Sequence, residues 1–218
     1  MSRKHKAILS IVIILLVIIA DQAIKVWVKT HMYLGENIHI ADWFQIRFIE
    51  NNGMAFGWEL GGKYFLTSFR IIAVIVIGIY LARCIRTRHT YGHVSNSTGY
   101  IVCLSLILAG AAGNIFDCLF YGLVFNNPPY PQVAQFVPWG SGYESFMLGR
   151  VVDMFYFPIL QWDMPDSWTW LNHVPMLPNA GEHCVFFSPI FNLADASISC
   201  AVIWLILFSR RFFRIRHR

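Results

Sequence analysis

Four apolar runs, each about long enough to cross a bilayer, constrain this chain more than any other feature of its sequence. They cover residues 7–28, 64–82, 98–116 and 189–208. Because a hydrocarbon core about 30 Å thick requires about 20 apolar residues in an α-helix, each run predicts one spanning helix. The composition agrees, since 56% of the residues are hydrophobic and only 13% are charged, a balance that is atypical of soluble domains. We therefore expect one integral membrane domain, residues 1–218, built as an all-α bundle of four transmembrane helices.

The basic residues indicate how these helices are oriented. Of the 17 Lys and Arg residues, 11 lie before the first run, between the second and third runs, or after the fourth, and none of the 12 acidic residues lies there. Because short cytoplasmic segments are enriched in Lys and Arg, this pattern predicts cytoplasmic termini and places residues 31–63 and 119–188 outside. It also accounts for the net charge of +5 without a nucleic-acid partner.

The two outer segments have patterns that are typical of folded structure. Residues 38–49 contain alternating and β-branched stretches, and residues 151–157 have a similar character, so both predict strands. Residues 126–142 and 161–181 are rich in Pro, Gly, Asn and Trp and predict loops or interfacial segments. The expected result is a small β-sheet with loops on the outer face of the membrane.

Several polar residues interrupt the apolar runs, where ionisable groups are costly and by default functional. Asp21 and Lys25 are four residues apart, which predicts an ion pair on one helix face. Arg70 is expected either to reach the headgroups or to pair with a carboxylate. The third run ends with small and polar residues that share one face and predict close helix packing beside a polar site: Gly110, Gly113, Asn114 and Asp117.

Two further aspartates lie where local structure does not require a charge. Asp153 interrupts the apolar stretch 151–155, although an exposed Asp between buried neighbours is the alternative explanation. Asp195 shares a predicted helix face with Asn192. The alternative explanation of Asp195 is helix capping, but we expect Asp195 to lie deeper in the helix than the usual cap position. Two carboxyl groups about 3 Å apart at an apolar boundary share a proton near neutral pH and can activate water without a metal, serine or cysteine.

Five motifs follow one another along the chain: Asp21-xxx-Lys25, Asn52-Gly53-Met54-Ala55-Phe56-Gly57, Gly110-Ala111-Ala112-Gly113-Asn114-xx-Asp117, Gly149-Arg150-Val151-Val152-Asp153 and Phe191-Asn192-x-Ala194-Asp195. Together they resemble the motifs of lipoprotein signal peptidase (signal peptidase II), a family of aspartyl proteases of the bacterial inner membrane. The resemblance covers most of the chain.

The resemblance implies an active site and a substrate. Asp153 and Asp195 match the catalytic pair, and the substrate is a prolipoprotein with a diacylglyceryl-modified cysteine, cut just before that cysteine. The residues implied to bind substrate or support the site are Asn52, Gly53, Asn114, Asp117, Asn192, Asp21, Lys25, Gly110 and Arg150. We expect a metal-free and cofactor-free monomer, in contact with membrane lipids, whose active site lies at the periplasmic face of the inner membrane.

The sequence departs from the family pattern after Asp117. The family usually has Arg at the next position, where this chain has Cys118, so Arg70 or Arg150 is a candidate to replace that Arg. The stretches between Asp117 and Gly149 and between Asp153 and Phe191 are longer than is usual in the family. A Cys118–Cys184 disulfide is one arrangement that the sequence allows.

Other classes of membrane protein also place polar residues in a bundle. A small transporter or channel with a polar outer vestibule is the main alternative, although transport sites usually lie near the midplane. A lipid-headgroup transferase would require a cluster of metal-binding acids or a basic phosphate site, and neither stands out. A non-enzymatic assembly factor would have no need for two separate Asp motifs.

Overall fold

Four helices form the membrane-embedded body of the molecule. The computed structural model describes residues 1–52, 62–87, 97–170 and 178–212. The helices are α1 (Arg3–His31), α2 (Gly62–Arg86), α3 (Thr98–Val124) and α4 (Leu193–Phe212), and each is long and apolar enough to cross a membrane. The prediction of a four-helix membrane bundle is confirmed.

Helix α3 is the central helix, and it packs against each of the other three. Its buried residues Ile101, Cys103 and Leu104 belong to a core cluster that also includes Leu81 of α2 and Ala201 of α4. Large apolar side chains on the other three helices are instead exposed, for example Leu16, Ile79 and Leu207. A helix that is apolar on its outward side suits a lipid environment, so these side chains have the position expected of lipid-facing residues.

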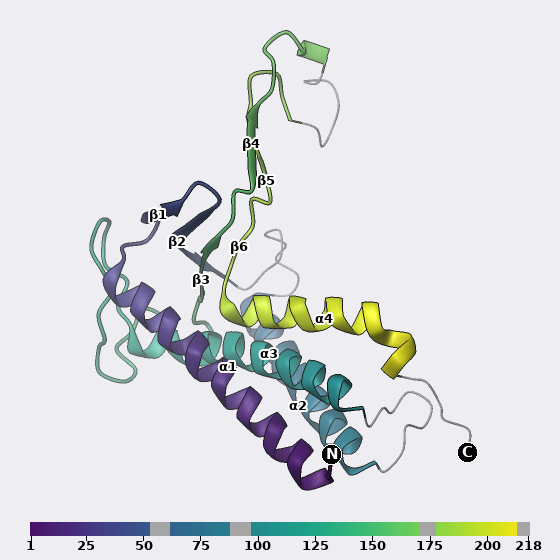
Figure 1. Ribbon diagram of the computed structural model, residues 1–218. Coiled ribbons are helices and arrows are strands. Elements are labelled where there is room, and N and C mark those ends of the chain that lie inside the picture. The colour runs from purple at the N-terminus through teal and green to yellow at the C-terminus, as the bar shows by residue number, and fades with distance from the viewer. Residues whose placement is uncertain (53–61, 88–96, 171–177, 213–218) are drawn as a thin grey trace.

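A four-stranded antiparallel sheet covers one end of this bundle, as Figure 1 shows. Its strands lie in the order β1 (Asn37–Ala41), β2 (Phe44–Asn51), β3 (Val151–Tyr156) and β6 (Ile190–Phe191). The strand predicted at 151–157 is confirmed. The strand pattern at 38–49 corresponds to two strands, β1 and β2, because the chain turns back between Ala41 and Phe44.

The start of α4 differs from the prediction. The fourth apolar run begins at residue 189, but residues Ile190 and Phe191 form β6 and pair with Tyr156 and Phe155 of β3. The helix therefore begins at Leu193. At the end of the third run the difference is opposite, since α3 continues for two turns beyond residue 116 to Val124.

A two-stranded arm extends from the sheet between β3 and β6. It consists of β4 (Leu160–Asp163) and β5 (His183–Phe186), which pair antiparallel. The prediction of loops over 161–181 is wrong for residues 161–163, which form part of β4. Their partners in β5 lie 20 to 24 residues further along the chain, so the pairing was not apparent from local composition. Residues 126–142 do form irregular structure, with only isolated bridges at Val133 and Phe136.

Both ends of the described chain lie far from the sheet. Figure 1 places the start of α1 and the end of α4 at the opposite end of the bundle from β1–β3. The start of α3 lies there too, since a Cβ on Gly99 would come within 2.9 Å of the Phe212 ring at the end of α4. We call the other end of the bundle, which carries β1, β2, β3 and β6, the sheet end.

Candidate active site

Asp153 projects from β3, the strand that lies between β2 and β6. Its side chain is only 3% exposed and accepts a hydrogen bond of 2.6 Å at Oδ1 from Asn192 Nδ2. Burial, reinforced by the nearby charge of Asp195, raises the pKa of Asp153 to about 7. Because the shift favours the protonated form, this carboxyl group can hold a proton near neutral pH.

Asp195 lies in the first turn of α4 and caps it together with Asn192. Asn192 Oδ1 accepts from the backbone N–H of Asp195 at 2.9 Å, and Asp195 Oδ2 accepts from the backbone N–H of Asn192 at 3.4 Å. This reciprocal arrangement is a capping box. The prediction that Asp195 lies too deep to cap was wrong, because α4 begins four residues after Pro189.

One asparagine side chain connects the two aspartates. Asn192 is fully buried; its amide nitrogen donates to Asp153 while its amide oxygen accepts from the backbone of Asp195. Asn114 of α3 completes the connection, since its Nδ2 donates to Asp195 Oδ1 at 2.7 Å and its Oδ1 accepts from Asn192 Nδ2 at 3.1 Å. The structure thus brings Asp153, Asp195, Asn114 and Asn192 together at the sheet end.

A buried ionic cluster lies directly behind these residues. Lys25 Nζ is 2.9 Å from Asp21 Oδ2 and 2.7 Å from Asp117 Oδ2, and all three side chains are at most 1% exposed. The predicted Asp21–Lys25 pair is therefore confirmed, with Asp117 as a third member. Lys25 Nζ also donates to Asn114 Oδ1 at 2.8 Å, so the cluster orients a residue that contacts Asp195.

The same cluster holds the backbone on both sides of the site. Asp21 Oδ1 accepts from the backbone N–H of Ala194 at 2.9 Å. Asp117 Oδ2 accepts from the backbone N–H of Val152 at 3.4 Å. Each of these backbone groups directly precedes one of the two aspartates, so the cluster fixes α4 and β3 relative to each other.

The small residues of α3 allow these elements to approach closely. A Cβ on Gly110 would lie 2.3 Å from Ala194 O, and one on Gly113 would lie 2.9 Å from Asp21 Oδ2. Gly110 therefore packs against α4 and Gly113 against α1. The predicted face of small and polar residues on α3 is confirmed as a packing face.

Two residues that the sequence analysis did not single out complete the cluster. Gln22 Nε2 donates to Asp117 Oδ1 at 2.8 Å, and Gln22 Oε1 accepts from the Tyr121 hydroxyl at 3.0 Å. Tyr121 is one helical turn beyond Asp117, which is a spacing that could have drawn attention to it. Gln22 gave no signal, because an uncharged polar residue beside Asp21 is easily assigned to the solvated end of a helix.

Asn51, rather than its neighbour Asn52, faces Asp153. A hydrogen bond from the Asn51 side chain to Asp153 opposes the rise in the pKa of that aspartate. Asn52 is exposed, and its Oδ1 accepts from Lys63 Nζ at 3.4 Å. Ile49 is the cross-strand partner of Asp153, so the two side chains lie on the same face of the sheet. Asn51 is two residues from Ile49 and shares that face, whereas Asn52 does not. Gly53 and the rest of its motif, up to residue 57, lie outside the described residues.

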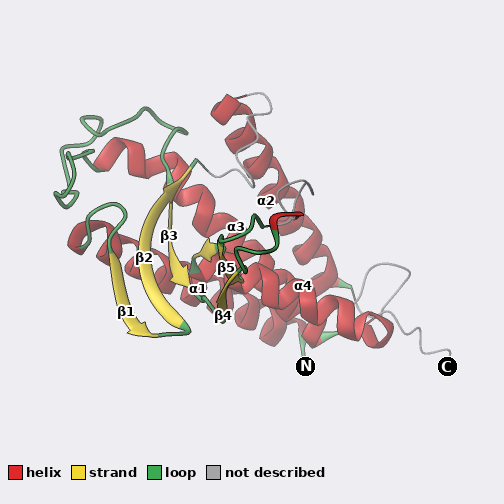
Figure 2. Ribbon diagram, turned by 90° about the horizontal axis from the view of Figure 1, so that it is seen from above, coloured by secondary structure: helices red, strands yellow, loops and turns green. Residues whose placement is uncertain are grey.

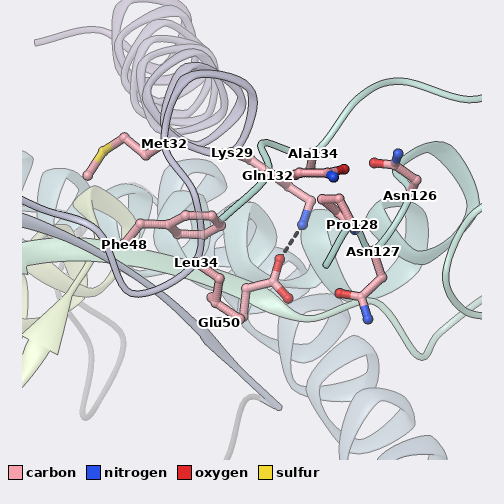
Figure 3. Close-up of a pocket in the computed structure, with 10 residues that line it drawn as sticks. All are labelled: Lys29, Met32, Leu34, Phe48, Glu50, Asn126, Asn127, Pro128, Gln132 and Ala134. Atoms are coloured by element: carbon pink, nitrogen blue, oxygen red, sulfur yellow. Dashed lines mark hydrogen bonds and ion pairs between the residues drawn. The ribbon is translucent and has the colours of Figure 1, made fainter. Parts of the chain in front are cut away.

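Arg150 lies on the other face of the sheet, where it belongs to a second charged cluster. Its Nη1 is 3.1 Å from Glu50 Oε2, and Lys29 Nζ pairs with the other oxygen of Glu50. Figure 3 shows Lys29 directed at Glu50 in a cavity of about 30 Å³. Arg150 and Asp153 are three residues apart, so the alternation of side chains directs them to opposite faces of the sheet. The expected role of Arg150 in binding substrate or supporting the site stays a prediction.

Arg70 contacts Cys118, since its Nη1 donates to Cys118 Sγ at 3.7 Å. The expectation that Arg70 reaches the headgroups or pairs with a carboxylate stays a prediction. Cys118 occupies the position at which the family usually has Arg, so the Arg70 guanidinium lies beside that position. The Cys118–Cys184 disulfide is absent, because both cysteines are free and buried at separate places, α3 and β5.

Within the described part of the chain, no group of three or more His, Cys, Asp or Glu side chains is arranged to hold a metal ion. The site consists instead of two carboxyl groups, three asparagine amides and a buried cation. Such a set can polarise a water molecule and transfer its proton.

Comparison with known proteins is consistent with this chemistry. The family model described as signal peptidase (SPase) II matches residues 13–211. A lipoprotein signal peptidase of Porphyromonas gingivalis (strain ATCC 33277) is 46% identical over 202 residues, which are 93% of this chain and 82% of the relative. One from Amoebophilus asiaticus (strain 5a2) is 33% identical over 205 residues, or 91% and 76% of the two chains.

The fold is also similar to that of solved structures. A bacterial membrane enzyme determined by the in meso method at 2.3 Å superposes with a TM-score of 0.60 and 22% identity, covering 96% of this chain and 93% of the other. A second, at 1.9 Å, gives a TM-score of 0.57 and 24% identity, covering 91% and 90%.

Proposed function

This chain belongs to the signal peptidase II family, and from that premise we propose that Asp153 and Asp195 are the catalytic pair of a lipoprotein signal peptidase. Members of the family are proteases, and this chain removes signal peptides from prolipoproteins. The alternative of a small transporter or channel is not supported, because the family match covers residues 13–211.

The pair works by sharing one proton. The ionised carboxylate takes a proton from a water molecule, whose oxygen attacks the carbonyl carbon of the scissile peptide bond. The protonated carboxyl group donates to the carbonyl oxygen as the tetrahedral intermediate forms. When the intermediate collapses, the C–N bond breaks and the leaving nitrogen takes a proton from the pair. One hydroxyl of the intermediate gives its proton back to the pair as the C=O bond re-forms, so that the pair again holds one proton.

The single observation that carries this proposal is the bridging of both aspartates by Asn192. The bridge keeps the buried Asp153 beside the half-buried Asp195, whose charge adds to the effect of burial on the pKa of Asp153. A pair of this kind retains one proton near neutral pH, which is the state that the reaction requires.

The remaining residues support the pair. Asn114 and Asn51 orient the carboxyl groups by hydrogen bonds, and the ionic cluster of Asp21, Lys25 and Asp117 holds the backbone around them. Arg150 and Asn52 are proposed to contact substrate rather than the pair, since both line a cavity of about 500 Å³ near Lys63.

Replacing each aspartate tests the mechanism. Asp153→Asn and Asp195→Asn should each abolish cleavage in folded protein, because Asn keeps the shape but does not exchange the proton, and the double variant should be no worse than either single one. Asp163→Asn, an exposed aspartate on the arm, is the matched control and should retain activity. Near-normal cleavage by either pair variant would refute the aspartyl mechanism.

The substrate class is tested separately. We propose that the enzyme acts on prolipoproteins that carry diacylglyceryl on the cysteine after the cut. Purified enzyme should cleave the modified prolipoprotein and leave its unmodified form intact. Equal cleavage of both forms would reject the lipid requirement while leaving the catalytic pair untouched.

We also propose that both termini are cytoplasmic and that the sheet end faces the periplasm of a bacterial inner membrane, with the enzyme as a monomer among membrane lipids. The support is the clustering of 11 of the 17 basic residues, since cytoplasmic segments are enriched in them. A cysteine introduced near residue 90 should resist labelling from outside, and one at Asp163 should react. Light scattering of the purified enzyme tests the monomer.

A further inference from the structure

The β4–β5 arm has two chemically different faces. Cross-strand partners lie on one face of a ribbon and successive residues alternate between faces. One face therefore carries the pairs Leu160–Phe186 and Trp162–Cys184, and the other carries Gln161–Val185 and Asp163–His183. The polar face is completed by the Asp163–His183 pair, with Oδ1 and Nδ1 2.6 Å apart.

Three of the four side chains on the apolar face are exposed in the folded chain, whereas Cys184 is buried. Leu160 is 60% exposed, Phe186 57% and Trp162 43%. A two-stranded ribbon by itself is marginally stable in water and normally requires its apolar face to be covered. An exposed apolar patch of this kind marks an interaction surface.

The position of the arm indicates what covers this face. Six residues separate Phe186 from Leu193, the first residue of the spanning helix α4, so the arm begins at the boundary where α4 enters the membrane. In Figure 1 the arm runs across the axis of α4 instead of continuing it, and in Figure 2, which is seen from above, β4 and β5 are foreshortened. The arm therefore extends sideways, along the membrane surface at the sheet end.

The composition of the arm also suits a lipid surface. Trp is enriched at the boundary between headgroups and hydrocarbon, where its ring is apolar and its N–H is hydrated. There is no Lys or Arg between Arg150 and Arg210, and the arm carries Asp163, Asp166 and Glu182. Attraction to anionic headgroups is thus excluded as the driving force, which leaves apolar contact with the glycerol and acyl region.

We propose that the apolar face of the arm, formed by Leu160, Trp162 and Phe186, rests on the lipids of the leaflet at the sheet end. This contact holds a ribbon whose strands lead directly from β3 and into β6, the strands next to Asp153 and Asn192. The membrane surface then sets the tilt of the sheet that bears the site. The inference goes beyond the proposed peptidase activity and does not depend on it.

Photocrosslinking in native membranes tests this contact. The photoreactive residue p-benzoylphenylalanine would be placed in separate full-length variants at Leu160 and Phe186 on the apolar face, and at Gln161 and Val185 on the polar face. Each variant is irradiated in membranes, and its adducts are identified by mass spectrometry. Cleavage activity of each variant verifies that it is folded.

Phospholipid adducts should form several-fold more at Leu160 and Phe186 than at the two control positions. The yield should be unchanged after reconstitution into vesicles of phosphatidylcholine alone, because the contact is apolar. Equal lipid yields on both faces, a protein adduct in place of lipid at Leu160, or no adduct at either apolar position in active enzyme would each overturn the proposal.

A pair of double variants gives a second, independent measurement. Leu160→Ser with Phe186→Ser removes apolar area from the proposed lipid face, whereas Gln161→Ser with Val185→Ser alters the opposite face at matched positions. In vesicles with bromine-labelled acyl chains, the first pair should reduce the quenching of tryptophan fluorescence and the second should leave it unchanged. The same quenching in both would contradict the lipid contact.

Discussion

Replacing Gly110 with alanine tests whether the packing of α3 against α4 determines the geometry of the aspartate pair. The added Cβ would lie 2.3 Å from Ala194 O, 2.6 Å from Ser197 Oγ and 2.8 Å from Ile198 Cγ1. The first of these is a backbone atom, so a side-chain rotation does not relieve the overlap. Helix α4 must move away from α3.

The size of that movement follows from ordinary contact distances. Non-bonded carbon and oxygen atoms are comfortable at about 3.5 Å, so the Ala194 carbonyl must move by about 1 Å. Ala194 directly precedes Asp195, whose Oδ1 accepts from Asn114 Nδ2 on α3 at 2.7 Å. The movement therefore stretches this hydrogen bond. A misplacement of about 1 Å in a catalytic group costs about 10²-fold in rate, and overpacking of a core costs about 1–3 kcal/mol in stability.

The assay measures kcat and KM for a diacylglyceryl-modified prolipoprotein together with thermal unfolding in the same detergent. We expect kcat to fall about 10²-fold with a smaller change in KM. Gly78→Ala on α2 is the matched control, because its Cβ would meet only the Leu108 side chain, with Cδ2 at 3.9 Å and Cδ1 at 4.0 Å, which are ordinary contacts. If Gly110→Ala cleaved substrate as well as Gly78→Ala does, the inferred role of the α3–α4 contact would be wrong.

Three further predictions concern the buried groups around the pair. Lys25→Met leaves Asp21 and Asp117 without their cation and should lower the free energy of unfolding, measured by chemical denaturation, by about 3–5 kcal/mol. Adding Asp117→Asn to this variant should restore part of the lost stability. Asn192→Ala should lower kcat about 10²-fold by releasing Asp153, and should destabilise α4 by about 1 kcal/mol as a lost cap; unchanged kcat would contradict the bridging role. The pKa of Asp153 is about 7 in the folded chain, against an ordinary value of 3.8, so between these values the folded state keeps a proton that the unfolded state releases. As pH rises from about 4 to 7, the wild type should therefore lose thermal stability relative to Asp153→Asn, and it should lose no more above that range.

The features that sequence predicted are those determined by local pattern. A run of about 20 apolar residues predicts a spanning helix, and the short β-branched and aromatic run at 151–157 predicts a strand. The i, i+4 spacing of Asp21 and Lys25 was likewise sufficient to predict their ion pair.

The features that sequence did not predict depend on pairing between distant segments. Which of the adjacent residues Asn51 and Asn52 faces Asp153 depends on the register of β2 against β3, and a shift by one residue would exchange them. Similarly, Ile190 becomes a strand residue because Tyr156 is available to pair with it. Register is a property of two strands together, so neither segment alone contains it.

The buried ionic cluster is better explained by its role in positioning the two aspartates than by a contribution to stability. Burying Asp21, Lys25 and Asp117 costs desolvation energy that their attraction repays at best in part, and apolar side chains would stabilise a membrane bundle without that cost. The carboxylates of the cluster, however, accept hydrogen bonds from the backbone N–H groups of Ala194 and Val152. An apolar replacement would provide no acceptor for these groups, and the start of α4 and the middle of β3 would be free to shift independently. Because the two aspartates of the site follow directly after these residues, the cluster fixes the distance between them, and that is the quantity on which a shared proton depends.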